Sequence, residues 1–162
     1  TSNTYGNFGQ VVDNVSCLAR YTNDLHCNIW YSKTALGYRN GLKLRLFGEQ
    51  GAAEWLQENP EYLTLTDRYG TKSIVDRASR DIKVANQGRY ARFKVGHPAG
   101  FVEAFANYYQ DTADALAAHL AGQPAAGEYV FGIKDALQGL RVLEAIADSS
   151  ANRCWATVET GT

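Results

Sequence analysis

The sequence predicts an α+β fold, because its hydrophobic pattern changes halfway along the chain. Alternating apolar and polar residues in the first half predict about six β-strands, a number that comes from counting alternations between turn signals. Apolar residues spaced three and four apart in the second half predict two long helices. Strands that precede helices favour a mostly antiparallel open sheet, with both helices packed on one face.

The strands are expected to form a series of hairpins. Alternation on either side of Asn23-Asp24 predicts a hairpin within residues 11–31. The most regular alternation covers residues 42–47 and is followed by a turn at 48–51 and a returning strand at 52–56. Asp67-Arg68-Tyr69-Gly70 predicts a further hairpin between its two flanking strands, 62–66 and 71–75. Residues 35–41, with two glycines, are expected to form a loop.

Both helices have recognisable ends. Pro98 is expected in the first turn of the first helix, with Glu103 close behind it, and Gly122 and Pro124 are expected to end that helix. The second helix is expected from about Lys134 to Asp148. A last short strand is expected from Trp155 to Val158.

Composition limits the class of protein and its partners. The chain has 162 residues, which suits one domain at residues 11–158 after a flexible N-terminal lead at residues 1–10. A net charge of -1 favours neither nucleic acid nor an anionic membrane as a partner, and no apolar run is long enough to cross a bilayer. Three cysteines without C-x-x-C spacing predict neither disulfides nor zinc, which favours the cytoplasm. The absence of methionine suggests an internal piece of a longer chain.

The sequence holds no self-sufficient active site. It has no dinucleotide fingerprint, phosphate loop or nucleophile elbow, and no histidines at metal-ligand spacing, so no catalytic, cofactor-binding or metal-ligating residue is assigned. His97, just before Pro98, could hydrogen-bond a substrate hydroxyl or donate a proton near neutral pH. The residues by themselves favour a capping or packing role at the start of the helix.

Two other groups of residues have both a functional and a structural interpretation. Residues 31–34 and 37–40 place polar side chains where a strand ends in a glycine-containing loop. Such loops often contact ligands, but the residues by themselves favour a solvated connection between strands. Glu54, Glu58 and Glu61 are close in sequence, and two carboxylates at a suitable separation could hydrolyse a glycoside. A free-standing sugar-binding or hydrolytic domain is therefore a further hypothesis.

Three blocks of sequence, in order, resemble the Gfo/Idh/MocA oxidoreductases. Residues 32–63 resemble that family's S-Q-V-A-x-G-x-x-N-x-L-x-I-x-I-x-G-x-x-G-x-L-x-W-x-Q-E-x-P-N-x-L pattern. Residues 97–107 resemble its H-P-x-G-Y-x-E-A-F-x-N pattern, and residues 135–146 resemble its D-G-L-x-G-x-x-x-x-E-A pattern. Two motifs that hold the family's catalytic residues, E-K-P and G-G-x-x-x-D-x-x-x-H, are absent from this sequence.

The resemblance implies the substrate-binding C-terminal domain of an NAD(P)-dependent dehydrogenase or reductase acting on a sugar, inositol or related polyol. NAD or NADP would be bound mainly by an N-terminal Rossmann domain absent from this chain, which leaves the chain inactive alone. The resemblance implies Ser32, Asn40 and His97 as substrate contacts, and their chain neighbours Lys33 and Arg39 are added as candidates. Lys33 replaces the glutamine of the family's S-Q dipeptide and adds a charge beside the expected pocket. The open sheet implies a homo-oligomer, and the alternative function is an oligomerisation or structural module without activity in isolation.

Overall fold

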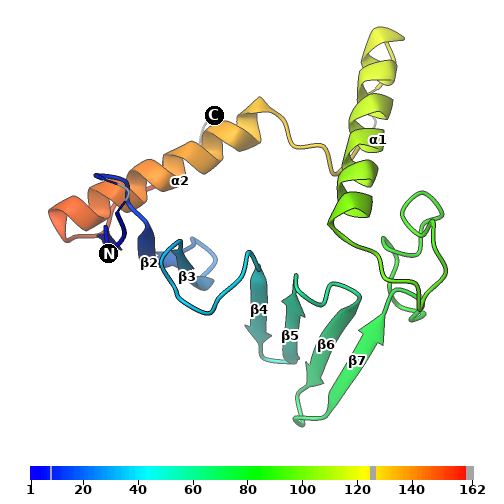
Figure 1. The fold of residues 1–162 in the computed structure, drawn as a ribbon, viewed down its shortest axis with the longest axis horizontal. Coiled ribbons are helices and arrows are strands. Elements are labelled where there is room, and N and C mark those ends of the chain that lie inside the picture. The colour runs from blue at the N-terminus through cyan, green and yellow to red at the C-terminus, as the bar shows by residue number, and fades with distance from the viewer. Residues whose placement is uncertain (8, 125–126, 160–162) are drawn as a thin grey trace. The chain divides into compact units, whose positions relative to one another are not determined.

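The computed structural model describes residues 1–7, 9–124 and 127–159, and it confirms the α+β class with open antiparallel sheets (Figure 1). The chain divides into two compact units. We call Thr1–Tyr38 together with Phe131–Thr162 the terminal unit, and Arg39–Val130 the central unit. None of the helices in the described residues is long and apolar enough to cross a membrane.

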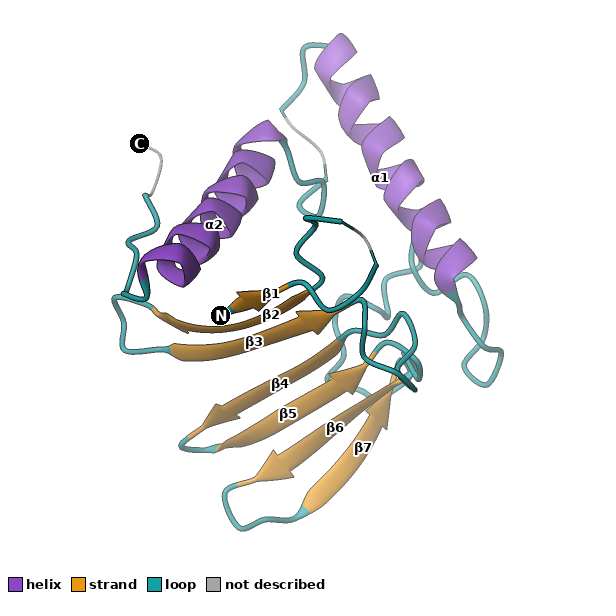
Figure 2. Cartoon of the chain, turned by 60° about the vertical axis from the view of Figure 1, so that its left-hand side comes forward, coloured by secondary structure: helices purple, strands orange, loops and turns teal. Residues whose placement is uncertain are grey.

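The terminal unit contains a three-stranded sheet with one helix against it (Figure 2). Strands β1 (Ser2–Asn3), β2 (Asn14–Arg20) and β3 (His26–Ser32) pair antiparallel in that order. The β2–β3 hairpin confirms the one predicted around Asn23-Asp24, and its register runs from Asn14↔Ser32 to Arg20↔His26.

Helix α2 (Ile133–Asn152) is joined to this sheet at its C-terminal end, where Ser150 Oγ accepts hydrogen bonds from the Ser2 amide at 3.0 Å and hydroxyl at 2.8 Å. The helix begins after Gly132, whose amide donates to the Asp135 carboxylate at 2.8 Å. This bond satisfies one of the backbone donors that a helix start leaves free. The least exposed apolar side chains of the described residues, Val15 and Ala145, lie on β2 and α2, so the core of this unit is small.

The central unit contains the four-stranded sheet β4-β5-β6-β7, which is antiparallel throughout. Its strands are β4 (Lys43–Gly48), β5 (Gly51–Leu56), β6 (Tyr62–Asp67) and β7 (Lys72–Asp76), close to the ranges expected from the alternation. The register places Leu44, Trp55, Leu63 and Val75 on one face as successive cross-strand neighbours, whereas Phe47 and Ile74 lie on the opposite face. The opposite face carries a polar set: Lys43, Arg45, Glu54, Thr64, Thr66 and Lys72.

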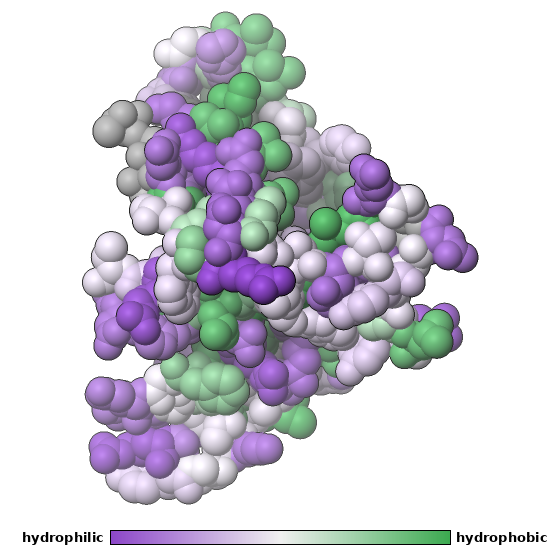
Figure 3. All heavy atoms as spheres, turned by 90° about the vertical axis from the view of Figure 1, so that its left-hand side faces the viewer, coloured by the Kyte–Doolittle hydropathy of each residue, from purple (hydrophilic) through white to green (hydrophobic). Residues whose placement is uncertain are grey.

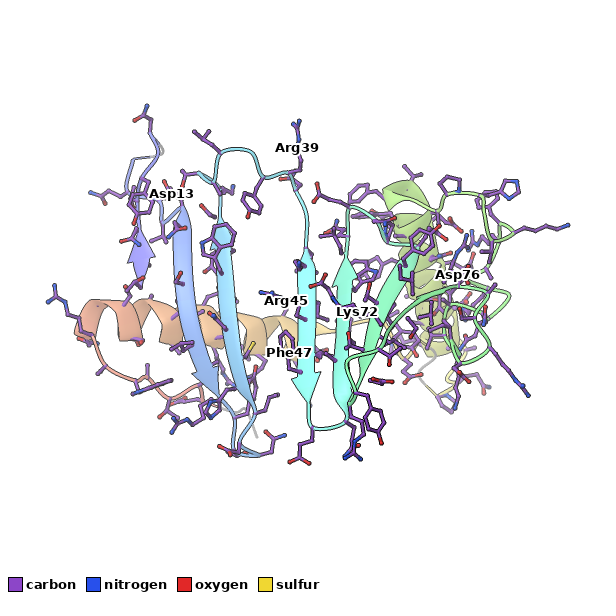
Figure 4. The ribbon with its side chains drawn as sticks, turned by 90° about the horizontal axis from the view of Figure 1, so that it is seen from below. Asp13, Arg39, Arg45, Phe47, Lys72 and Asp76 are labelled. Carbon is purple, nitrogen blue, oxygen red and sulfur yellow. The ribbon has the colours of Figure 1, made fainter. Side chains whose placement is uncertain are left out.

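Strand direction decides which loops of the central unit meet. Because neighbouring strands run antiparallel, β4 and β6 begin at the end of the sheet where β5 and β7 finish. The segments outside these four points are residues 39–42, residues 57–61 and the chain from Arg77 onward. They therefore lie at one end of the sheet, and the two hairpin turns lie at the other. Figure 4 shows Arg39 beyond the end at which β4 begins.

Several expectations require correction or refinement. The strands form two hydrogen-bonded sheets of three and four strands, and Ser2–Asn3 adds a short strand inside the N-terminal lead, of which Phe8 lies outside the described residues. Helix α1 (Phe101–Leu120) begins after Gly100, so Pro98 precedes the helix instead of lying in its first turn. The predicted strand at 155–158 was wrong, because a strand needs a hydrogen-bonded neighbour and these residues have none in a sheet.

Many apolar side chains stay exposed in both units. Leu44, Leu46 and Ile74 of the central sheet are exposed, as are Phe101 and Leu120 of α1. In Figure 3, hydrophobic side chains remain visible between hydrophilic ones on the face drawn there. Such surfaces are typical of regions that another chain or domain covers.

The β4–β5 turn offers a test of the sheet register. Gly51 has φ +156°, and a Cβ atom there would lie 2.3 Å from the Thr66 carbonyl oxygen on β6. We expect Gly51→Ala to lower the free energy of unfolding by about 1–3 kcal/mol, because either the backbone or the β5–β6 pairing must shift. Gly48→Ala is the matched control, since the nearest atom to its Cβ is 3.8 Å away. Equal denaturant midpoints for the two variants would contradict the register.

Candidate functional site

Asn40 is presented at the tip of a tight turn before β4. The Gly41 amide donates to the Arg39 carbonyl at 2.8 Å, a three-residue turn with Asn40 at its centre. The turn is joined to the β5–β6 connection by two bonds: Leu42 N–H donates to Gln57 Oε1 at 3.0 Å, and Gln57 N–H to the Leu42 carbonyl at 2.8 Å. Arg39 and Asn40 are both exposed, so both side chains can reach a ligand.

The same β5–β6 connection carries Glu61, which forms the most enclosed ion pair of the described residues. Arg77 Nε lies 2.8 Å from Glu61 Oε2, and the two side chains are only 12% and 17% exposed. Arg77 Nη1 donates to the Phe93 carbonyl at 3.4 Å and Nη2 to the His97 carbonyl at 3.2 Å. The other Glu61 oxygen accepts from the Ala99 amide at 3.0 Å. The loop that carries His97 is therefore bound to the same end of the sheet as the Asn40 turn.

His97 is exposed, and its ring has a defined hydrogen bond. Nδ1 lies 3.1 Å from the Lys94 carbonyl oxygen, which can only accept, so Nδ1 carries the proton. In the neutral ring Nε2 is then an acceptor for a ligand hydroxyl. The N-cap of α1 is Gly100, with no side-chain capping bond, so the structure shows no capping contact for His97.

Ser32 and Lys33 belong to the terminal unit, at the end of β3. The Ser32 hydroxyl accepts from the Thr34 amide at 3.1 Å and lies 3.2 Å from the Thr34 hydroxyl. The Lys33 amide donates to the Asp13 carbonyl at 2.7 Å, while the Lys33 side chain is exposed and has no carboxylate at salt-bridge distance in the described chain. The structure brings Arg39, Asn40 and His97 into one unit, with Ser32 and Lys33 in the other.

The Asp13 carboxylate organises the loop before β2. It is buried and accepts from the Tyr5 amide at 2.9 Å and the Gly6 amide at 2.6 Å. A buried carboxylate needs such partners, because burying it without them costs several kcal/mol, on the order of the desolvation penalty of an ion. Asp13 therefore joins the N-terminal segment to the backbone of Lys33, the position expected to contact substrate. Figure 4 labels Asp13 near the start of β2.

A second carboxylate, Asp111, joins α1 to the preceding loop. It is buried and accepts hydrogen bonds from Arg89 and from the Tyr90 hydroxyl, the latter at 2.8 Å. Arg89 also reaches Asp114 at 2.8 Å. The hydrogen bond to Asp111, followed by burial, raises the pKa of Tyr90 above its ordinary value. The hydrogen bond from Arg89 to Asp114 raises the pKa of the guanidinium further.

The three neighbouring glutamates do not form a glycosidase-like pair in the described contacts. Glu61 is committed to Arg77 and Ala99, and Glu54 lies 3.1 Å from Lys43 on the face of the sheet. Glu58 packs beside Gly41, where an added Cβ would lie 3.1 Å from its carboxylate. No group of three His, Cys, Asp or Glu side chains in the described ranges could hold a metal ion.

A groove of about 570 Å³ lies in the terminal unit, and none of the five predicted site residues lines it. It runs between β2 and the C-terminal end of α2, with Leu18, Ile146 and Trp155 among its lining residues. A shallower depression on the central sheet is lined by residues of β4, β5 and β6, again without a predicted contact residue. The candidate contacts Arg39, Asn40 and His97 therefore lie on loops at one end of the central sheet, outside both of these hollows.

Sequence reasoning missed the residues that hold these loops. Arg77 and Glu61 are 16 positions apart, and Tyr90 and Asp111 are 21 apart, so no local motif joins either pair. Glu103 and Asn107 were also missed as buried acceptors; both Glu103 carboxylate oxygens and Asn107 Oδ1 lack a hydrogen-bond partner in the described part of the chain. The available signal was a charge next to a predicted strand end: Glu61 directly before residues 62–66 and Arg77 shortly after residues 71–75.

Comparisons with solved structures identify the fold. An oxidoreductase from Sinorhizobium meliloti is 30% identical, with a TM-score of 0.76 over 93% of this chain and 42% of that chain. An oxidoreductase from Pseudomonas syringae, 24% identical, has a TM-score of 0.75 over 90% of this chain and 40% of that chain, and shows the fold alone. An inositol dehydrogenase homologue from Azotobacter vinelandii, complexed with NADH and myo-inositol, is 26% identical, with a TM-score of 0.62 over 70% of this chain and 30% of that chain.

The chain thus spans about two fifths of the length of the first two oxidoreductases it matches. No model of a known protein family matches the sequence, and no curated protein matches it. The structural neighbours are oxidoreductases, and the chain has the fold of part of those proteins.

The raised pKa of Tyr90 gives a test of the Asp111 contact. Because Asp111 favours the protonated phenol, its stabilising effect is complete below the ordinary tyrosine pKa of 10.0 and is lost as pH rises through the higher folded value. We expect Asp111→Asn to bring the Tyr90 pKa down towards 10.0, measured by tyrosinate absorbance against a Tyr90→Phe reference. Asp114→Asn is the control, since Asp114 contacts Arg89 but not Tyr90. An unchanged titration in Asp111→Asn would contradict the contact.

Proposed function

We propose that the chain is the substrate-binding C-terminal domain of an NAD(P)-dependent oxidoreductase of the Gfo/Idh/MocA family, acting on a CH–OH group of a sugar, inositol or related polyol. The observation that carries the proposal is the likeness to an oxidoreductase over 93% of this chain at 30% identity. The three sequence blocks that resemble the family support it, as does the inositol dehydrogenase homologue among the structural neighbours.

The cofactor would belong to another part of the protein. This sequence has no G-x-G-x-x-G fingerprint, so its residues do not fit a dinucleotide-binding role. The proposal therefore assigns NAD or NADP to an N-terminal Rossmann domain outside this chain, where the cofactor would accept or supply the hydride. The residues in this chain then have to bind and orient the polyol.

The exposed loops at one end of the central sheet carry side chains that can bind a polyol. His97 Nε2 is an acceptor for a substrate hydroxyl, because Nδ1 donates to Lys94. The Asn40 amide, at the tip of its turn, can both donate and accept, which matches a hydroxyl that does the same. Arg39 adds a positive charge next to Asn40. The proposal adds Ser32 and Lys33, from the terminal unit, as further substrate contacts.

The test is a dehydrogenase assay of the full-length protein that contains this chain, with NAD⁺ or NADP⁺ and a panel of polyols and sugars. We expect reduction of the nucleotide with at least one polyol, and neither activity nor dinucleotide affinity in the 162-residue chain alone. His97→Ala should lower kcat/KM by about 10-fold or more, since one hydrogen bond to substrate is lost. His119→Ala, in the last turn of α1, is the matched control and should leave the kinetics unchanged.

Two results would contradict the proposal. Calorimetry that detects tight NAD(P) binding to the chain alone would overturn the proposal that a separate domain binds the cofactor. Kinetics of His97→Ala equal to those of His119→Ala would remove His97 from the substrate site and leave it as a loop residue.

Oligomerisation through the open sheet is the second proposed role, favoured by the exposed apolar side chains of β4 and β7. We expect the full-length protein to sediment as an oligomer, and Leu46→Glu on β4 to shift it towards the monomer. Leu36→Glu is the control, because Leu36 is fully exposed in a loop outside the sheet. A wild-type protein that sediments as a monomer at every concentration would exclude this role.

A further inference from the structure

We propose that the Arg77–Glu61 ion pair is a positioning device that sets the His97 loop for substrate binding. The inference rests on the proposed function, in which His97 contacts the substrate. Neither Arg77 nor Glu61 would touch the substrate. Both would act through the backbone of the loop that presents the imidazole.

The pair binds the loop on both sides of His97. Arg77 uses all three nitrogens of its guanidinium: Nε on Glu61 at 2.8 Å, Nη1 on the Phe93 carbonyl at 3.4 Å and Nη2 on the His97 carbonyl at 3.2 Å. Glu61 completes the arrangement by accepting from the Ala99 amide at 3.0 Å. The planar fork of arginine can make these bonds together, whereas a lysine ammonium cannot reach all three acceptors in the same way.

The sheet holds the pair in place. Tyr62 and Asp76 are direct partners in the β6–β7 register, so Glu61 and Arg77 are the next residues beyond the last rung of that ladder. Asp76 also fixes the chain that follows, because its carboxylate accepts from the Ala78 amide at 3.0 Å and its amide donates to Ser79 Oγ at 3.0 Å. Figure 4 shows Asp76 at the end of β7, directly before Arg77 in the chain.

The stretch around His97 has few other contacts in the described chain. Within residues 94–97 the described contacts are local: the His97 amide and ring both bond the Lys94 carbonyl, across Gly96 at φ +93°. Side chains in this stretch are exposed. The connection between this stretch and the sheet therefore runs through Arg77 and Glu61, which would set the position of the imidazole.

Burial separates this pair from an ordinary surface salt bridge. Lys43 and Glu54 form a pair on the same sheet, but their side chains are 49% and 44% exposed, against 12% and 17% for Arg77 and Glu61. Exposed pairs contribute little to stability, and removing one partner of an enclosed pair leaves an uncompensated charge. Replacing both partners by apolar side chains of similar volume avoids that charge and is often tolerated.

The experiment uses the full-length protein and the double substitution Arg77→Met with Glu61→Leu, in the wild-type and His97→Ala backgrounds. We expect the double substitution to lower kcat/KM by about 10- to 100-fold with a near-normal melting temperature, because a displacement of about 1 Å in a positioned group can cost that much. In the His97→Ala background the same substitution should lower kcat/KM by less than about 3-fold, since the two changes remove one interaction. Equal losses in both backgrounds would overturn the proposal and leave a general structural role.

Arg77→Lys and an exposed pair supply the controls. Arg77→Lys keeps the charge and the fold but loses the bonds to both loop carbonyls, so we expect a raised KM with native stability; wild-type kinetics for this variant would overturn the proposal. Lys43→Met with Glu54→Leu removes the exposed pair by the same chemistry and should leave kcat/KM unchanged.

Hydrogen exchange tests whether Arg77 and Glu61 hold the His97 loop, independently of the proposed function. The Ala99 amide should exchange at least 10-fold faster in the Arg77→Met, Glu61→Leu protein, whatever the protein acts on, because its acceptor is gone. Unchanged exchange at Ala99 would show that Glu61 and Arg77 do not hold the loop, and would overturn the proposal. Exchange at Ala99 could become faster while His97→Ala leaves kcat/KM unchanged. That result would overturn the proposed substrate role of the loop, and with it the positioning role of the pair.

Discussion

The antiparallel ladder of β4 to β7 is the constraint on which the candidate site depends. In such a ladder every second connection returns to the same end of the sheet, so the chain before β4, the β5–β6 connection and the chain after β7 meet there. Residues that are far apart in sequence thereby become neighbours. The turn of Asn40 and the loop of His97 both bind the β5–β6 connection, through Gln57 and Glu61. A change of register in one strand would separate them.

The ion pairs of the described residues differ in their exposure to solvent and in what they connect. On the face of the central sheet, Lys43 and Glu54 pair in solvent and can be exchanged at little cost to stability. Arg77 with Glu61, and Arg89 with Asp111, are more enclosed and connect loops to strands and to α1. Such pairs contribute less to net stability than to a single arrangement of the backbone, because their geometry requires specific partners. Arg77 begins the long loop before α1 and Arg89 lies within it, so both pairs restrict the conformation of that loop.

The five predicted substrate contacts come from both compact units. Arg39, Asn40 and His97 belong to the central unit, and Ser32 and Lys33 end β3 in the terminal unit. Each group has its own support: Gln57 holds the Asn40 turn, Arg77 and Glu61 hold the His97 loop, and the Asp13 carbonyl accepts from the Lys33 amide.

The sequence by itself determined the fold class, the hairpins and the two helices, because alternation and helical spacing are local properties that each segment carries with it. It also predicted His97 and Asn40 as substrate contacts, through motifs whose spacing is local, and both assignments stay predictions. Tertiary structure alone decided the partners of Glu61, Arg77, Tyr90 and Asp111, since each pair is joined only when β6, β7 and α1 have folded. It likewise decided where α1 begins: the N-cap is Gly100, and Pro98 lies before the helix and not in its first turn. The reason is physical: periodicity predicts which face of a strand or helix is apolar, but a long-range ion pair depends on where the loops meet.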